Sequence, residues 1–156
     1  NFIMGIQNYR RMNGGVNRTS SASPNLYLAL IIKVYRFLSR RTHSRFNKTV
    51  LKRLFMSRKN QSNVSISKIN KIAKKNPGKT IVVVGKILND ERIDKISLIK
   101  VCALSCSVSA KNRIEMSGGE FYTFGKFSLK YPTGKNSILL RGSSKFKKKK
   151  NKKNLK

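Results

Sequence analysis

The sequence predicts one domain of class α/β or α+β with a basic segment at each end. Apolar residues recur at helical spacing through the first half of the chain. From Thr80 onward, short runs typical of strands alternate with a further helical segment. Residues 1–23 are polar and contain three arginines and no acidic residue, whereas residues 143–156 are rich in lysine. We therefore expect a basic arm at residues 1–23, one domain at 24–142 and a lysine-rich tail at 143–156.

Three helices are expected before residue 80. Ser23 is a favourable N-cap and Pro24 is tolerated at the first helical position, so the first helix should begin there and run to Arg41. One side should be buried, through the apolar residues Tyr27, Leu30, Ile31, Val34 and Leu38, while Lys33, Arg36 and Arg40 align on another face. Further helices are expected at 47–57 and at 65–75 or 67–75.

Strands dominate the second half of the predicted domain. The β-branched run from Thr80 to Val84 is long enough for a buried strand and too short for a helix. Gly118 and Gly119 favour the end of a preceding helix, and residues 132–134 predict a turn. The other expected elements are strands at 100–105, 121–123 and 137–140 and a helix at 108–117.

The charge of the chain limits the classes of partner that it can bind. It has 36 lysines and arginines against 5 acidic residues, which gives a formal net charge of +31. A compact monomer with this charge repels itself, whereas a dense anion neutralises it. Nucleic acid is the first candidate partner and an anionic membrane the second. No acidic residue precedes Asp90, so the first half of the fold should present almost uninterrupted positive potential.

Composition also indicates the redox state of the compartment and whether the chain could span a membrane. The best apolar run, residues 26–32, is far short of the ~20 residues that a transmembrane helix needs. Cys102 and Cys106 cannot form a disulfide framework, which favours a reducing compartment. The first 23 residues have the composition of an organelle transit peptide. A basic arm that binds RNA has the same composition and fits the rest of the chain better.

Three patterns that could indicate an enzyme or a metal site have simpler interpretations. Residues 73–80 match a relaxed phosphate-loop pattern, but a helix precedes them and a strand follows, which is the reverse of the required order. Cys102 and the single histidine, His43, could form a catalytic pair, yet Cys102 has the apolar neighbours of a buried residue. Four zinc ligands at a usual spacing are not available. We therefore expect no catalytic residue, no metal and no cofactor.

The acidic cluster of Asp90, Glu91 and Asp94 allows two interpretations. Its carboxylates could hold a magnesium ion that bridges to RNA. Local pairing with Arg92 and Lys95 is the favoured interpretation, because these cations are adjacent in the sequence.

Basic residues are the remaining candidates for function. Hardly any acidic residues separate them, and the arginines offer the planar fork that matches phosphate. Nearby aromatic residues lie mostly on apolar stripes, which indicates core positions more than base-stacking platforms. The candidate RNA-binding residues are Arg10, Arg11, Arg36, Arg40, Arg41, Arg45, Lys52, Arg53, Arg58, Lys59, Arg92, Arg113, Lys135, Arg141, Lys147, Lys148, Lys149 and Lys150.

Ordered blocks over about residues 23–142 resemble one known family. The blocks are 23–27, 35–42, 46–47, 51–57, 80–85, Asp90 with Arg92, Val101 with 103–104, Ala110 with 113–114, 118–120, Pro132, Gly134, Asn136 and 139–142. Together they resemble the large-subunit ribosomal protein family L-eighteen-e. The resemblance implies the fold of the bacterial L-fifteen type, a single irregular layered α/β domain of short strands and helices.

The resemblance also implies a non-enzymatic role. A member would bind large-subunit ribosomal RNA beside neighbouring ribosomal proteins, without a membrane or small-molecule substrate. It would act in the cytoplasmic ribosome after assembly in the nucleus or nucleolus, where Lys147–Lys150 could serve as an import signal. Eukaryotic members continue after Gly142 with a further segment and an Arg/Gly-rich end, whereas residues 143–156 here are mostly lysine. Contacts made by that end in relatives should be missing or replaced by electrostatic ones.

Two other function classes remain as alternatives. A nonspecific DNA-compacting cationic protein would explain the charge, but it needs neither the ordered blocks nor a strand-rich half. An enzyme acting on RNA would need an acid–base, nucleophile or metal set that the sequence does not offer. The sequence therefore predicts a structural constituent of the large ribosomal subunit that binds ribosomal RNA in cytosolic translation.

Overall fold

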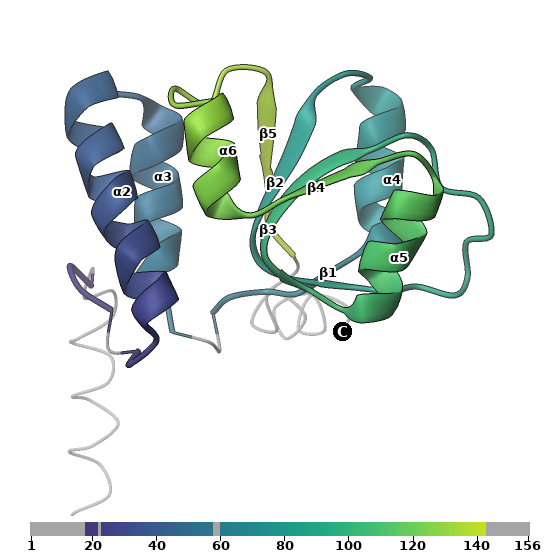
Figure 1. The fold of residues 1–156 in the computed structure, drawn as a ribbon, viewed down its shortest axis with the longest axis horizontal. Helices are drawn as coiled ribbons and strands as arrows, with labels where there is room; N and C mark the ends of the chain where they lie inside the picture. Colours follow the sequence, from purple (N-terminus) through teal and green to yellow (C-terminus); the bar gives the residue numbers. More distant parts are fainter. Residues whose placement is uncertain (1–17, 22, 58–59, 143–156) are drawn as a thin grey trace, which may run out of the picture.

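The computed structural model describes residues 18–21, 23–57 and 60–142 (Figure 1). Within these residues, helices and strands alternate after two leading helices. The helices are α2 (Leu26–Thr42), α3 (Arg45–Leu54), α4 (Ile66–Lys75), α5 (Val108–Met116) and α6 (Phe124–Lys130). The strands are β1 (Val64–Ser65), β2 (Thr80–Leu88), β3 (Lys100–Cys106), β4 (Glu120–Tyr122) and β5 (Ser137–Leu140).

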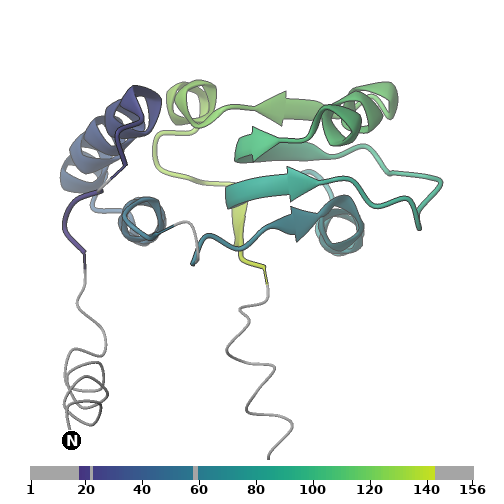
Figure 2. The same cartoon turned by 90° about the horizontal axis from the view of Figure 1, so that it is seen from below.

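All the described strands pair in parallel. Their order is β1-β2-β3-β4, which Figure 2 shows edge to edge, and β5 pairs with β2 as well. Because β3 occupies one edge of β2, β5 and β1 share the other edge. β5 pairs with residues 80–83 and β1 with residues 87–88, so the two short strands lie end to end. A parallel sheet with helical crossovers confirms the expected α/β class.

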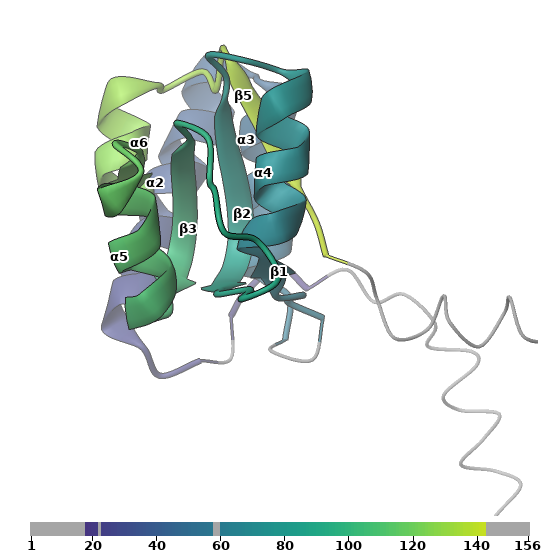
Figure 3. The same cartoon turned by 90° about the vertical axis from the view of Figure 1, so that its right-hand side faces the viewer.

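Helices cover both faces of the sheet (Figures 1 and 3). Val82 and Val84 of β2 pack in one apolar cluster with α2, α3 and α6. Ile81 and Val83 pack in a second cluster with α4 and α5. Successive side chains of a strand point to opposite faces, so β2 contributes to both cores. This explains why its sequence is a continuous β-branched run without alternation.

Two predicted helix starts are corrected. Asn25, and not Ser23, is the N-cap of α2, because its Oδ1 accepts a hydrogen bond from the Tyr27 amide at 3.0 Å. α3 begins at Arg45, two residues before the expected Asn47. Asn47 is buried instead, and its Nδ2 donates to the Pro132 carbonyl at 2.8 Å. Ser and Asn are equally good caps, so local sequence does not decide between them.

Two elements were not predicted. α6 is seven residues long and contains Gly125, which disfavours a helix. It forms because Phe124 and Phe127 are fully buried against α2 and the sheet. β1 is two residues long, too short to show a pattern, and the edge of β2 alone specifies it. In both cases tertiary packing outweighs local preference.

Tyr35 provides a test of the first core. Its ring is 1% exposed and meets the ring of Phe124 edge to face at 5.7 Å, but its hydroxyl has no hydrogen-bond partner among the described residues. Burial raises the pKa of this phenol well above its usual value. Tyr35→Phe should raise the free energy of unfolding by about 1 kcal/mol, because an unsatisfied buried hydroxyl is removed. Urea unfolding followed by circular dichroism measures this change.

The half-exposed Tyr27 is the matched control, and Tyr27→Phe should leave the stability unchanged. A loss of stability in Tyr35→Phe that exceeds the change in Tyr27→Phe would show that the Tyr35 hydroxyl has a partner.

Candidate nucleic-acid interface

The acidic residues of the chain lie in one part of the fold, away from helices α2, α3 and α4. All five acidic residues fall between Asp90 and Glu120, in the β2–β3 loop, α5 and the start of β4. Glu120 lies 3.7 Å from Lys100 and 3.8 Å from Lys130, and Glu115 lies 3.7 Å from Lys111. Helices α2, α3 and α4 contain no acidic residue at all. Their cations therefore have no carboxylate on their own helix to neutralise them.

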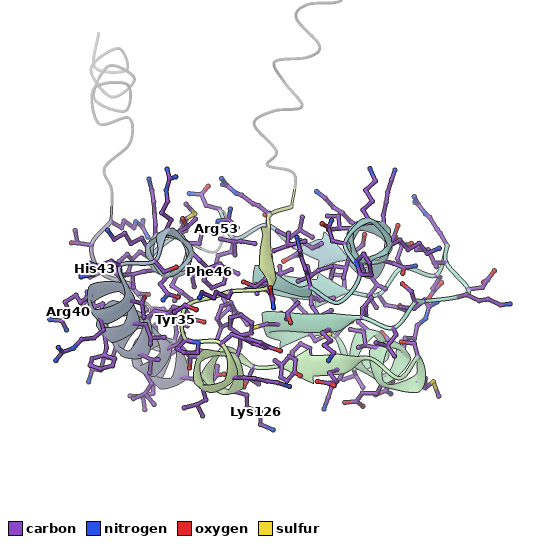
Figure 4. The ribbon with its side chains drawn as sticks, turned by 90° about the horizontal axis from the view of Figure 1, so that it is seen from above. Tyr35, Arg40, His43, Phe46, Arg53 and Lys126 are labelled. Atoms are coloured by element: carbon purple, nitrogen blue, oxygen red, sulfur yellow. The ribbon has the colours of Figure 1, made fainter. Side chains whose placement is uncertain are left out.

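Helix α2 has three distinct faces. Ile31, Ile32 and Tyr35 are buried, and of these helical spacing predicted Ile31. Lys33, Arg36 and Arg40 are exposed on a second face, and Figure 4 shows Arg40 pointing away from the protein. The third face is apolar and exposed, and it consists of Leu26, Leu30, Val34 and Phe37. The expectation that Tyr27, Leu30 and Val34 are buried is wrong, since they are 44%, 58% and 41% exposed.

Aromatic rings orient two of the α2 arginines. The guanidinium of Arg36 lies 5.5 Å from the centre of the Phe55 ring, and its Nη2 donates to the Thr19 carbonyl at 2.8 Å. The guanidinium of Arg41 lies 5.7 Å from the centre of the Phe37 ring. A stacked guanidinium keeps its edge donors available and loses less conformational entropy on binding. Core positions were expected for most aromatic residues near the arginines, and Tyr35 and Phe55 are buried, whereas Phe37 is exposed.

Helices α3 and α4 carry two further sets of cations. Arg45, Lys48 and Lys52 on α3 are exposed, whereas Arg53 is half-buried and Figure 4 shows it between α3 and β5. On α4 the exposed cations are Lys68, Lys71, Lys74 and Lys75. Sequence reasoning did not include this α4 group. Its signal was present, because lysines three and four residues apart on a helix without acids share one side.

The guanidinium of Arg113 forms hydrogen bonds within the protein. Its Nη1 donates to Asn89 Oδ1 at 3.0 Å and to the Asp90 carbonyl at 2.8 Å. Its Nη2 donates to the carbonyls of Ile93 and Asp94. Four donor positions of the guanidinium are thus used to hold the β2–β3 loop, which leaves little for a phosphate.

The acidic cluster does not pair as expected. Asp90 Oδ1 accepts a hydrogen bond from the backbone amide of Arg92 at 3.3 Å. Among the described residues, however, no ion pair joins the cluster to the side chains of Arg92 or Lys95, so that prediction is wrong. The loop carbonyls are instead stabilised by Arg113. In the same part of the chain, no three metal-binding side chains converge.

The other candidates are dispersed over the molecule. Arg92 is exposed in the acidic loop, Lys135 is exposed in the turn before β5, and Arg141 is exposed directly after β5. Eight predicted RNA-binding residues lie outside the described residues: Arg10, Arg11, Arg58, Lys59, Lys147, Lys148, Lys149 and Lys150.

The burial that the sequence indicated for Cys102 is confirmed. Cys102 is fully buried in the core between β2, β3 and α6, and burial raises the pKa of its thiol. Cys106 is half-buried, and burial also raises the pKa of its thiol. His43 is exposed at the C-cap of α2, on a different element. A raised thiol pKa opposes formation of the nucleophilic thiolate.

A groove lies beside the start of α2. Its volume is about 800 Å³, and it runs between the segment before α2, the loop after α3 and the end of β3. Leu28, Phe55 and Leu104 give it apolar walls, while Arg18 and Ser21 provide polar ones. Apolar walls with cations at the border suit an unstacked base attached to its phosphate.

Comparison with known proteins identifies the family. The model of the family "Ribosomal protein 60S L18 and 50S L18e" matches residues 5–154. The chain belongs to this family. L18/L18e proteins are ribosomal proteins and not enzymes, which agrees with the expected absence of a catalytic set and rules against an RNA-modifying activity.

Individual relatives in the L18/L18e family agree. The chain is 45% identical over 141 residues to the large ribosomal subunit protein eL18 of Diaphorina citri, which covers 89% of this chain and 75% of the relative. It is 46% identical over 143 residues to eL18B of Schizosaccharomyces pombe, with 89% and 76% covered. It is 48% identical over 128 residues to eL18 of Theileria parva, with 82% and 70% covered. The resemblance that the ordered blocks indicated is thus confirmed.

Within the described residues, no helix of this L18/L18e member is both long and apolar enough to cross a bilayer.

Removing the Arg113 guanidinium should loosen the β2–β3 loop. Arg113→Gln should lower the free energy of unfolding by about 1.5–3 kcal/mol, the range for hydrogen bonds to a charged group. Amide hydrogen exchange in residues 89–94 should accelerate at the same time. Arg92→Gln removes an exposed arginine from the same loop and should change neither quantity. Unchanged exchange in Arg113→Gln would contradict the bridging role.

The raised pKa of the Cys102 thiol predicts how the free energy of unfolding depends on pH. The folded protein keeps Cys102 protonated at pH values where the unfolded chain loses this proton, so stability should fall as pH rises above about 8.5. Urea unfolding at about pH 7 and about pH 10 measures the fall, which should be smaller in Cys102→Ala. An equal fall in both proteins would show that Cys102 ionises freely in the fold.

Proposed function

We propose that this protein is a structural constituent of the large ribosomal subunit and binds large-subunit ribosomal RNA through the cations of α2, α3 and α4. One observation supports this interface above all: these helices expose arginines and lysines and contain no carboxylate. A phosphate backbone supplies the closely spaced negative charge that such a surface lacks. The relatives from Diaphorina citri, Schizosaccharomyces pombe and Theileria parva are all large ribosomal subunit proteins.

The exposed helix cations that we assign to RNA here fall into two groups. Arg36 and Arg41 are held by aromatic rings and would bind phosphate with little further ordering. Arg40, Arg45, Lys52 and the α4 lysines are exposed without such support and would act mainly as positive charge. We do not assign Arg113 to RNA, because its donors hold the β2–β3 loop. Arg92 is also outside the proposed interface, since acidic residues adjoin it in sequence.

Specificity requires more than phosphate contacts. Phosphates position a protein, whereas RNA shape and unstacked bases supply sequence information. The groove between Leu28, Phe55 and Leu104 is the feature that could receive such a base. The arm at 1–23 and the tail at 143–156 would add phosphate contacts that depend little on sequence.

Neighbouring large-subunit proteins are the second proposed class of partner. The exposed apolar face of α2 adjoins its basic face, and phosphate cannot satisfy an apolar surface. Packing against another protein would remove this surface from water.

The proposed cellular location is the cytoplasmic ribosome, with assembly in the nucleus or nucleolus. Lys147–Lys150 would serve as the import signal. The nonspecific DNA-compacting alternative is tested by sedimentation of a native lysate that contains a tagged chain. Migration with large subunits is expected, and migration with chromatin would contradict the proposal.

The interface predicts a specific salt dependence. The double variant Arg40→Gln/Arg45→Gln removes two exposed cations whose side chains make no hydrogen bond or ion pair within the described residues. The log–log slope of affinity against salt for protein-free large-subunit RNA should become shallower by about 0.7–0.9 for each phosphate that the variant no longer neutralises. Filter binding over a salt series gives this slope.

Lys95→Gln is the control for the salt experiment. It removes one exposed positive charge from the acidic loop, outside the proposed interface, and should leave the slope unchanged. If the double variant also keeps the wild-type slope, the assignment of α2 and α3 to RNA is wrong.

A further inference from the structure

Two arginines line one small crevice on the surface of the domain. Arg53 comes from the last turn of α3, and Arg141 directly follows β5. The crevice has a volume of about 10 Å³, and its remaining walls are Met56, Asn60, Gln61, Ser62, Val84 and Leu140. This volume is about the space that one water molecule needs, so a single oxygen atom can enter it.

The sheet topology brings these two arginines together. β5 ends and β1 begins along the same edge of β2, and the chain that enters β1 passes the end of β5. Gly142 lies so close that a Cβ there would collide with the carbonyl of Asn63 and the side chain of Ser62. A Cβ on Gly85 would approach the Ser62 carbonyl to 2.8 Å. The walls of the crevice are therefore tightly packed and leave little freedom for rearrangement.

Hydrogen bonds hold the crevice from both sides. Arg53 Nη1 donates to the Leu140 carbonyl at 3.1 Å, which fixes the guanidinium at the end of β5. Lys68 Nζ of α4 donates to the carbonyl of Arg141 at 3.3 Å. Helices α3 and α4 thus place one cation each beside the last residues of β5, and Arg141 adds a third.

No carboxylate neutralises these charges. None of the five acidic side chains forms an ion pair with Arg53, Lys68 or Arg141 in the described structure. Partial burial and the nearby charge of Arg141 lower the pKa of the Arg53 guanidinium. Two guanidinium groups that repel each other in a partly desolvated crevice are destabilising unless an anion joins them.

We propose that Arg53 and Arg141 together bind one phosphodiester group of large-subunit ribosomal RNA. This proposal rests on the proposed function and names one contact within it. One phosphate oxygen would enter the crevice and accept from Arg53, while a second oxygen would accept from Arg141. Both guanidinium groups offer planar pairs of donors that match phosphate oxygens.

An RNA strand fits this site better than a carboxylate of a neighbouring protein. A carboxylate would neutralise one cation, whereas a strand brings a further phosphate to Lys68. The crevice also adjoins the large groove, since Met56 and Gln61 line both. A nucleotide next to the bound phosphate would therefore find apolar walls for its base.

The experiment compares Arg53→Gln, Arg141→Gln and the double variant in binding to protein-free large-subunit RNA. Each single variant should weaken binding about tenfold or more, because a charge-assisted hydrogen bond is removed. If both arginines hold the same phosphate, the double variant should lose less than the product of the two single losses. Losses that multiply would show that the arginines act on separate groups and would overturn the proposal.

Phosphate ethylation interference gives a second, independent readout. Ethylation of one particular phosphate should block binding of the wild-type protein. Both single variants should lose their sensitivity at that same phosphate and keep it elsewhere. Loss at two different phosphates would contradict a shared site.

Controls separate this proposal from the proposed function and from misfolding. Arg141 has an exposed side chain, so Arg141→Gln should fold like the wild type and can carry the test if Arg53→Gln unfolds, as thermal unfolding will show. If both crevice variants bind RNA like the wild type while Arg40→Gln/Arg45→Gln does not, the crevice proposal fails and the proposed function stands. If the crevice variants weaken only the binding of a ribosomal protein, the anion is a carboxylate and the proposal is wrong.

Discussion

The packing of β2 is the constraint on which the rest of the structure depends. This strand pairs with β3 on one edge and with both β5 and β1 on the other. Val82 and Val84 supply one core, and Ile81 and Val83 supply the other. Because both faces and both edges of β2 are occupied, the strand has no room for a charged residue until Lys86. Most cations of the described residues are consequently placed on the helices and loops around it.

This arrangement separates the charges of the molecule. The acidic residues are confined to the β2–β3 loop, α5 and β4. Arg113 donates hydrogen bonds to that loop, and Lys100 and Lys130 form ion pairs with Glu120. Helices α2, α3 and α4 carry only positive charge. Self-repulsion among these cations opposes the compact state, and bound phosphate would remove it. Membership of the L18/L18e family fits a surface of this kind.

Most elements could be predicted because their signals are local. The β-branched run at 80–84, the segment at 137–140 and the glycines after α5 describe backbone preferences that need no partner. The helix starts were harder, because Ser23, Asn25 and Asn47 are all acceptable N-caps, and at Asn47 only its hydrogen bond to Pro132 decides. α6 and β1 escaped prediction since their stability comes from burial and from the edge of β2.

The sequence by itself determined the fold class, the family and the excess of positive charge, since periodicity, ordered residue blocks and composition are properties of the linear chain. Only the tertiary structure decided where each described cation lies and which atoms it contacts. It directed Arg113 inward to loop carbonyls and left the apolar face of α2 exposed. It also brought Arg53 and Arg141 to one crevice. The physical reason is that these contacts depend on strand order, where β5 returns from the end of the domain to the edge of β2.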